Sequence, residues 1–125
     1  MRKLTLFTAL MGLAALPALA DGDAADGEKV FKKCKACHDV GEDAKNKTGP
    51  VLNGIVGMAA AQNPDFKYSD DMKAAGEAGL TWDEETLDKY LKKPKDVVPK
   101  TKMTFAGLRK EDEIEDVIAY LKTFE

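Results

Sequence analysis

The two cysteines and the only histidine of this 125-residue chain lie in one short stretch, Cys34-Lys35-Ala36-Cys37-His38. A Cys-x-x-Cys-His motif is the covalent attachment signature for haem. Each thiol can add to one vinyl group of the macrocycle, and the adjacent imidazole can then reach the iron as an axial ligand. The motif therefore predicts a fold built around one haem c, bound covalently through Cys34 and Cys37.

Two other uses of the cysteines fit the sequence less well. A structural disulfide or a thiol–disulfide redox pair would suit an exported protein, but the redox motif accompanies a βαβ pattern, which is missing here. A zinc site normally takes four protein ligands, and the sequence has no second Cys or His pair. Haem attachment is the interpretation that uses all three side chains.

The amino-acid composition also points to a cofactor. Leu, Ile, Val and Phe make up about a fifth of residues 21–125, the level below which charged chains tend to stay disordered. Protein side chains alone would build a marginal core, so we expect another apolar group to complete it. The chain has 19 Lys and Arg; without Arg2 and Lys3, 17 remain against 22 acidic residues, a net charge of −5. This balance argues against a nucleic-acid partner.

Residues 1–20 have the layout of a cleavable secretory signal peptide. Two basic residues precede an apolar stretch from Leu4 to Leu16, and the segment ends in Ala18-Leu19-Ala20. The alternative is a membrane anchor, but the apolar stretch is shorter than the ~20 residues that cross a bilayer. We therefore expect cleavage after Ala20, a periplasmic protein without a membrane anchor, and one monohaem domain over 21–125.

Apolar residues at helical spacing predict a helix at each end of this domain. Asp23 is a suitable N-cap, and the helix after it runs into the cysteine motif. The same spacing recurs near the C-terminus at Ile114, Val117, Ile118 and Leu121. Gly27 inside the first helix costs about 1 kcal/mol relative to Ala, and close approach by another helix would explain its presence. We expect the first and last helices to cross at Gly27.

The middle of the chain predicts shorter helices joined by polar loops. A capping box at Thr81 and Glu84 predicts the start of a helix that ends before Pro94. A further short helix is expected to start at Ser69. Two segments with Gly, Pro and many polar residues are predicted loops: 45–64 and 94–107. The pattern as a whole predicts an all-α fold.

A haem that carries electrons needs a sixth ligand, and residues 21–125 offer Met58, Met72 and Met103 because no second His exists. Methionine most often fills gaps in a core, and we interpret Met58 and Met72 in this way. Met103 lies in a polar loop that lacks helical spacing, so a bond to iron explains it better.

These motifs together resemble those of class I cytochromes c, in the same order and at nearly the same spacing. The chain is most similar to the small soluble bacterial members close to mitochondrial cytochrome c, of the cytochrome c2 kind. The residues that carry the resemblance are Cys34-x-x-Cys37-His38, Thr48-Gly49-Pro50, Trp82, Tyr90-Leu91-x-x-Pro94, Lys102-Met103-x-Phe105 and Ile118-Ala119-Tyr120-Leu121.

The resemblance implies a class I cytochrome c fold, in which three to five helices, with crossing N- and C-terminal helices, wrap around one covalent haem c. It implies His38 and Met103 as the axial ligands of the iron, with the Pro50 carbonyl accepting the ring N–H of the ligand histidine. Tyr68 and Trp82 match positions that hydrogen-bond a haem propionate; the alternative for both is plain core packing. Two more residues are expected to bind the cofactor: Tyr90 and Thr101.

With both axial positions filled, we expect an electron-transfer protein and not an enzyme. The leading hypothesis is a monomeric periplasmic shuttle between a membrane quinol-oxidising cytochrome bc complex and a terminal oxidase or photosynthetic reaction centre. One alternative is a peroxide-reactive haem enzyme, which would require Met103 to leave the iron. Another is an electron donor dedicated to one periplasmic reductase.

Lysines gather around both candidate ligands and predict a positive docking face for an acidic partner surface. The lysines around the haem motif are Lys29, Lys32, Lys33 and Lys35, and those flanking the Met103 loop are Lys89, Lys92, Lys93, Lys95, Lys100 and Lys102. For any single lysine, a solvated surface position is the simpler interpretation.

Overall fold

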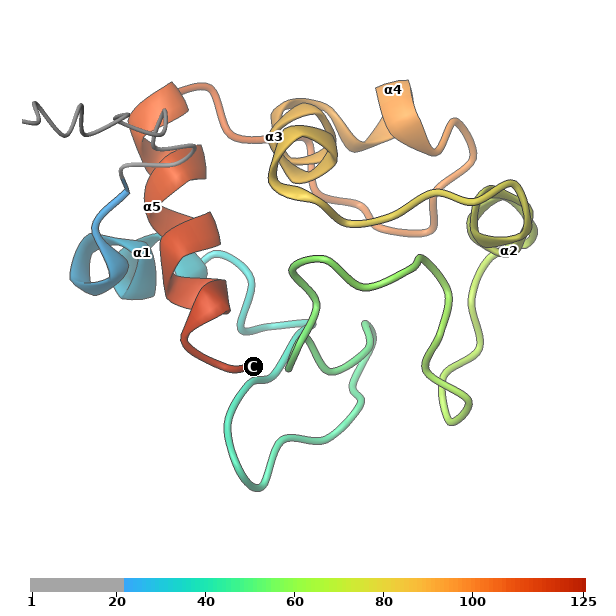
Figure 1. Cartoon of the computed structure of the whole chain (residues 1–125), viewed down its shortest axis with the longest axis horizontal. Coiled ribbons are helices and arrows are strands. Elements are labelled where there is room, and N and C mark those ends of the chain that lie inside the picture. Colours follow the sequence, from blue (N-terminus) through green and yellow to red (C-terminus); the bar gives the residue numbers. More distant parts are fainter. Residues whose placement is uncertain (1–21) are drawn as a thin grey trace, which may run out of the picture.

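The computed structural model describes residues 22–125, and this part of the chain contains five helices (Figure 1). They are α1 (Ala24–Phe31), α2 (Asp70–Glu77), α3 (Glu84–Lys92), α4 (Pro94–Val97) and α5 (Glu111–Lys122). Within the same residues, β-structure is limited to one isolated bridge between Ala59 and Thr81. The predicted all-α fold is confirmed. The predicted signal segment 1–20 lies outside the described residues.

None of these helices combines the length and the apolar character needed to cross a membrane.

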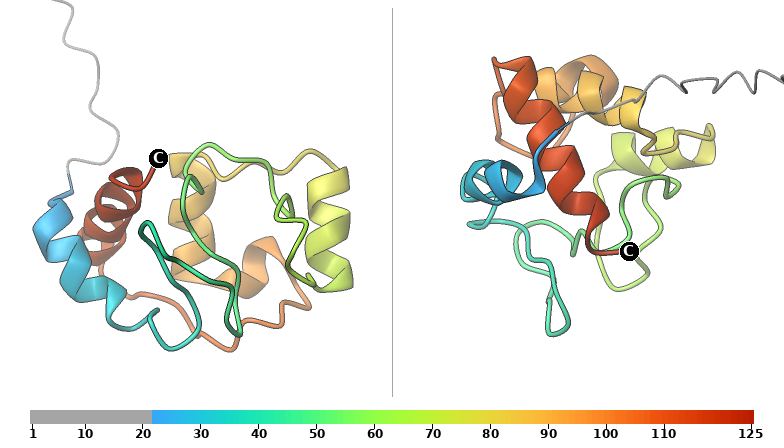
Figure 2. Two further views of the ribbon diagram at one scale, coloured as in Figure 1. Left: turned by 90° about the horizontal axis from the view of Figure 1, so that it is seen from below. Right: turned by 60° about the vertical axis from the view of Figure 1, so that its left-hand side comes forward.

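Helices α1 and α5 pack across each other, as the sequence predicts (Figures 1 and 2). The Asp23 side chain caps α1 by accepting hydrogen bonds from the backbone N–H groups of Ala25 and Asp26, at 2.8 and 3.1 Å. Gly27 is buried, and a Cβ at this position would overlap the carbonyl oxygen of Asp116 and press on the Cβ of Tyr120. The predicted crossing at Gly27 is confirmed.

Replacing Gly27 by Ala tests this close approach. Ala is the better helix former by about 1 kcal/mol, so helix propensity alone predicts stabilisation. Because the added methyl group has no room against the α5 backbone, we expect instead a loss of about 1 to 3 kcal/mol in the free energy of unfolding. Chemical denaturation measures it. Glu28→Ala, one position along on the exposed side, should stay within about 0.5 kcal/mol of the parent, and a stabilised Gly27→Ala variant would contradict the predicted contact.

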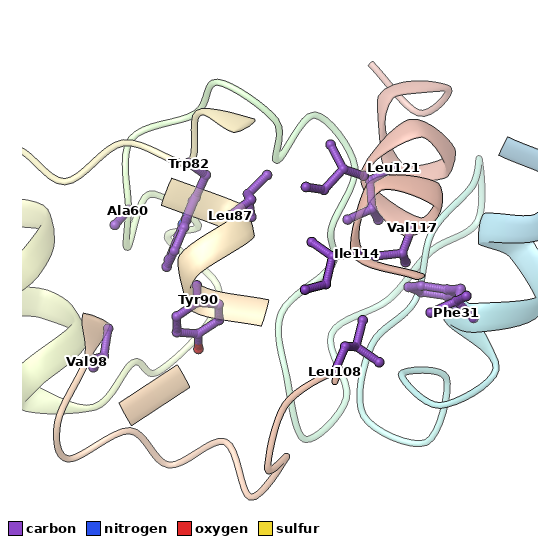
Figure 3. Packing of buried hydrophobic residues seen from close by; sticks show 12 residues of the cluster. Phe31, Ala60, Trp82, Leu87, Tyr90, Val98, Leu108, Ile114, Val117 and Leu121 are labelled. Carbon is purple, nitrogen blue, oxygen red and sulfur yellow. The ribbon is translucent and has the colours of Figure 1, made fainter. Parts of the chain in front are cut away.

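Most of the buried side chains lie between α5, α3 and the end of α1, while Ala60 and Val98 lie on the other side of α3 (Figure 3). Helix α5 contributes the largest group, Ile114, Val117, Ile118 and Leu121, each less than 5% exposed. Leu87 faces this group from α3, while Phe31 packs on it from α1 (Figure 3). Trp82 and Tyr90 pack against each other on the far side of α3, with ring centroids 4.7 Å apart.

Helix α3 begins two residues later than the sequence predicts. The N-cap is Asp83, whose side chain accepts a hydrogen bond from the N–H of Thr86 at 2.7 Å. The predicted cap Thr81 instead pairs with Ala59 in the isolated bridge, next to the buried Trp82. The capping box was therefore a wrong prediction, because pairing with the 57–60 loop keeps Thr81 in an extended conformation.

Two ion-pair groups join the ends of α3 to the opposite ends of α5. The Lys92 ammonium lies 3.1 Å from Asp88 and 2.8 Å from Glu111, which starts α5. At the other end Glu84 pairs with Lys122. The two helices therefore run antiparallel, and together they form one wall of the molecule.

Of the other two helices, one was predicted and one was not. Ser69 caps α2 as expected, and its hydroxyl accepts from the N–H of Met72 at 3.1 Å. The segment 94–107 was predicted as loop throughout, but α4 occupies its first four residues. Pro94 is the first residue of α4, where its missing N–H is not needed and its fixed φ suits a helix. The remainder of that segment and all of 45–64 lack helical structure, as predicted.

Candidate functional site

A cavity of about 1210 Å³ lies inside the molecule, lined by residues of α1, α2, α3 and α5 and by the long loops. Its volume exceeds the 300–1,000 Å³ typical of small-molecule pockets. Apolar side chains such as Leu52, Ile55 and Leu91 form much of its wall. Every site residue predicted from the sequence lines this cavity: Cys34, Cys37, His38, Pro50, Tyr68, Trp82, Tyr90, Thr101 and Met103.

The two cysteines follow directly on α1 and are half-buried against the cavity. The N–H of Cys34 donates to the carbonyl of Phe31 at 2.8 Å, and the N–H of His38 donates to the carbonyl of Cys34 at 2.9 Å, so helical turns continue through the motif. Cys34 and Cys37 are not joined by a disulfide. Burial, with a smaller contribution from Cys37, raises the pKa of Cys34. Both thiols are available for a bond to a group in the cavity.

The His38 ring is held by the Thr48-Gly49-Pro50 loop. Its Nδ1 lies 2.8 Å from the carbonyl oxygen of Pro50, so Nδ1 carries the proton and donates, and Nε2 keeps its lone pair. Burial lowers the pKa of His38, with the Pro50 hydrogen bond acting in the opposite direction. A Cβ at Gly49 would overlap the imidazole ring. The site therefore requires Gly49, a role that the sequence motif did not indicate.

Met103 lies in the loop that follows α4 and lines the cavity. The Tyr90 hydroxyl donates to its sulfur at 3.8 Å, and the Met103 N–H donates to the Thr101 hydroxyl at 3.1 Å. Burial raises the pKa of Tyr90, which keeps the phenol protonated as a donor, although a hydrogen bond with Thr101 opposes this shift. The structure thus brings Tyr90, Thr101 and Met103 into one connected group.

Tyr68 and Trp82 also line the cavity. The Tyr68 hydroxyl accepts a hydrogen bond from the N–H of Asn63 at 3.0 Å, and its own proton remains free to donate elsewhere. Trp82 is 5% exposed, and its backbone N–H donates to the carbonyl of Met58 at 2.8 Å. Both residues are therefore held at the cavity wall, Tyr68 through its hydroxyl and Trp82 through its backbone.

Sequence reasoning missed one link between the loops of the site. The Asn46 side-chain oxygen accepts hydrogen bonds from the N–H of Val51 at 2.9 Å and from the Asn63 amide at 3.0 Å. It thereby joins the loop that holds His38 to the loop that ends at Tyr68. Asn in a Gly- and Pro-rich segment signals a local turn, and nothing in that signal indicates a contact 17 residues away.

The other two methionines also line the cavity, so its lining alone does not select Met103. Met58 is 38% exposed, while Met72 is half-buried and packs against the core cluster. Met103 differs from both in the hydrogen bond that its sulfur receives from Tyr90.

The cavity and its residues fit a covalently attached macrocycle. An apolar space of this size within about 100 residues would collapse unless a large group filled it. The cavity is lined by two thiols one turn apart, a neutral imidazole and a thioether. Soft sulfur and imidazole donors suit an iron porphyrin. A helical fold closed around such a site defines a c-type cytochrome.

Residues 24–125 match the family model described as Cytochrome c, and the chain belongs to this family. It is 55% identical over 101 residues to cytochrome c2 of Afifella marina, covering 81% of this chain and 82% of that protein. It is 57% identical over 106 residues to cytochrome c2 of Rhodomicrobium vannielii, covering 85% and 82%. The solved structure of cytochrome c2 from Rhodospirillum centenum superposes with a TM-score of 0.78 at 47% identity, covering 82% of this chain and 98% of that one.

Membership of this family establishes the class of activity. The protein is an electron-transfer protein and not an enzyme, and it carries haem c bound covalently, with Cys34 and Cys37 as the thiols of the attachment motif. The resemblance stated from the sequence motifs and the class I cytochrome c fold are both confirmed.

Proposed function

We propose that the protein is a periplasmic one-electron shuttle between a membrane quinol-oxidising cytochrome bc complex and a terminal oxidase or photosynthetic reaction centre. The proposal rests on two observations: His38 and Met103 line the same cavity as the two cysteines, and the Met103 sulfur receives a hydrogen bond from Tyr90. With an imidazole and a thioether on the iron, no coordination position is open for substrate or oxygen. Bound haem c supplies one iron that accepts and releases a single electron.

His38 and Met103 are the residues that would bind the iron. The Pro50 carbonyl holds the proton on Nδ1 of His38, which leaves the Nε2 lone pair for a metal. Tyr90 and Thr101 hold Met103, one through its sulfur and the other through its backbone N–H. A soft thioether in an apolar cavity favours the lower iron charge, so we expect a positive reduction potential.

Tyr68 and Trp82 are proposed to donate hydrogen bonds to a haem propionate. Both line the cavity, and the Tyr68 hydroxyl still has its proton to donate. An apolar cavity wall alone would leave a propionate carboxylate without partners, at a large free-energy cost.

We also propose that the chain is exported and works as a monomer. Residues 1–20 would be removed after Ala20, leaving 21–125 as the haem domain in the periplasm without a membrane anchor. In the periplasm the carrier would lie beside the periplasmic faces of its proposed membrane partners.

The structure divides the lysines of the proposed docking face into two groups. Five of them form ion pairs with acidic side chains: Lys29, Lys33, Lys89, Lys92 and Lys93. Within residues 22–125, the other five have no such pair: Lys32, Lys35, Lys95, Lys100 and Lys102. The unpaired group includes Lys35, inside the haem motif, and Lys102, next to the candidate ligand. These charges are free to meet an acidic partner.

Salt and charge reversal test this docking face. We expect electron transfer with purified cytochrome bc complex to slow steeply with added salt, because the Debye length falls from ~30 Å at 0.01 M to ~3 Å at 1 M. At low salt Lys35→Glu and Lys102→Glu should each slow the second-order rate by about tenfold, measured by stopped-flow absorbance.

Lys73→Glu is the matched control, because Lys73 is an exposed lysine of α2 outside both clusters. Lys122 is a poorer control than its exposed position suggests, since its reversal would break the pair with Glu84. A rate that is indifferent to salt, or equal slowing by Lys73→Glu, would remove the docking face while leaving the fold and the haem site intact.

A further inference from the structure

The loop that carries Met103 is tied to the protein chiefly at its two ends. At the start, the N–H of Val98 donates to the carbonyl of Pro94 at 2.9 Å. At the finish, the N–H of Leu108 donates to the carbonyl of Leu91 at 2.7 Å. Both anchors belong to the α3–α4 region, so they fix where the loop begins and ends without fixing how its middle approaches the cavity.

Besides Tyr90 of α3, which bonds to the Met103 sulfur, one side chain from another element bonds to the backbone in the middle of this loop. Oδ2 of Asp71, in the first turn of α2, accepts a hydrogen bond from the backbone N–H of Lys100 at 3.1 Å. Across residues 22–125, no other side chain outside the loop hydrogen-bonds to the backbone of residues 99–106. Asp71 therefore connects α2 to a point three residues before Met103.

The Asp71 carboxylate does not cap the helix to which it belongs. Ser69 is the N-cap of α2 and accepts from the N–H of Met72, so the helix start does not depend on Asp71. Asp70 occupies the same first turn, is exposed and, within residues 22–125, makes no hydrogen bond or ion pair with the loop. Asp70 and Asp71 thus place the same negative charge in the first turn of α2. Only Asp71 bonds to the Met103 loop.

We propose that Asp71 is a positioning residue that holds the Met103 loop closed over the cavity. The inference rests on the proposed role of Met103 as an iron ligand. A segment with few hydrogen bonds opens easily, and loss of the cross-link from α2 shifts its equilibrium toward the open form. Because an external ligand can bind iron only when Met103 has left, its apparent affinity rises with the fraction of open loop.

Imidazole binding to the oxidised haem protein measures this equilibrium. Asp71→Ala should bind imidazole about three- to tenfold more tightly than the parent, the factor set by one hydrogen bond of ordinary strength. It should also lose the near-infrared Met-to-iron absorption band at a lower temperature than the parent. Asp71→Asn keeps an oxygen acceptor at the same distance and should remain within about twofold of the parent.

Asp70→Ala is the matched control and should bind imidazole as the parent does, although it loses the same charge from the same helix turn. Equal affinities of Asp71→Ala and the parent would overturn the proposal, as would equal effects of Asp70→Ala and Asp71→Ala. Failure of the Asn variant to restore the parent affinity would overturn the hydrogen-bond role. If the parent itself lacked the near-infrared band, the ligand assignment would fail first, and this inference with it.

Discussion

Replacement of Met103 by Ala is expected to abolish the near-infrared Met-to-iron absorption band and to lower the reduction potential. On the proposed ligation the Met103 thioether is the soft ligand that favours the reduced iron, and Ala provides no substitute, so a shift on the order of a few tenths of a volt is expected. Reactivity toward peroxide should rise, because one coordination position becomes open. Absorption spectroscopy, potentiometric titration and stopped-flow mixing with peroxide measure the three effects.

Met58→Ala and Met72→Ala are the matched controls, since both side chains line the same cavity. Each should keep the near-infrared band, although Met72→Ala should lower stability because Met72 packs against the core. Loss of the band in Met72→Ala together with its survival in Met103→Ala would show that the ligand is Met72. The Tyr90 hydrogen bond to the Met103 sulfur would then need another explanation.

A chain that cannot attach haem is expected to lose its tertiary structure. In a Cys34→Ser, Cys37→Ser double variant both thioethers are gone, and the cofactor that fills the cavity is no longer retained. Without the cofactor, the apolar side chains around the cavity of about 1210 Å³ would lose their packing contacts and face water. A domain of this size has only about 5–15 kcal/mol of stability to lose. Far-UV circular dichroism should show lost helicity and no cooperative melting.

The parent chain, produced where no haem is attached, controls for the two serines and should be equally unfolded. Thiol and hydroxyl groups are of similar size, so the substitutions themselves remove little packing. A haem-free chain with native helicity and a cooperative transition would contradict the idea that the cofactor completes the core. It would also require the apolar side chains, about a fifth of residues 21–125, to suffice alone.

The crossing of the two terminal helices was predictable because their contact requires residues that can be recognised in the sequence. The apolar residues of α5 recur at helical spacing, and Gly27 interrupts α1 where only the absence of a side chain permits the approach of Asp116. In contrast, Asp83 replaced Thr81 as the cap of α3 because Thr81 pairs with Ala59, more than 20 residues away. A local sequence pattern cannot predict the outcome when capping by a residue competes with its pairing to a distant one.

By itself the sequence determined the attachment chemistry and the family, since both depend on residues that are neighbours along the chain. Cys34, Cys37 and His38 lie within one helical turn of each other, so their spacing already places them together. The tertiary structure alone decided how that site is held. The Tyr90 hydroxyl on Met103 and the Asp71 carboxylate on Lys100 join segments 13 and 29 residues apart, whereas the Pro50 carbonyl on His38 was expected from the family resemblance. Hydrogen bonds over such separations depend on how the loops fold around the cavity, and no spacing rule within a helix or a turn encodes them.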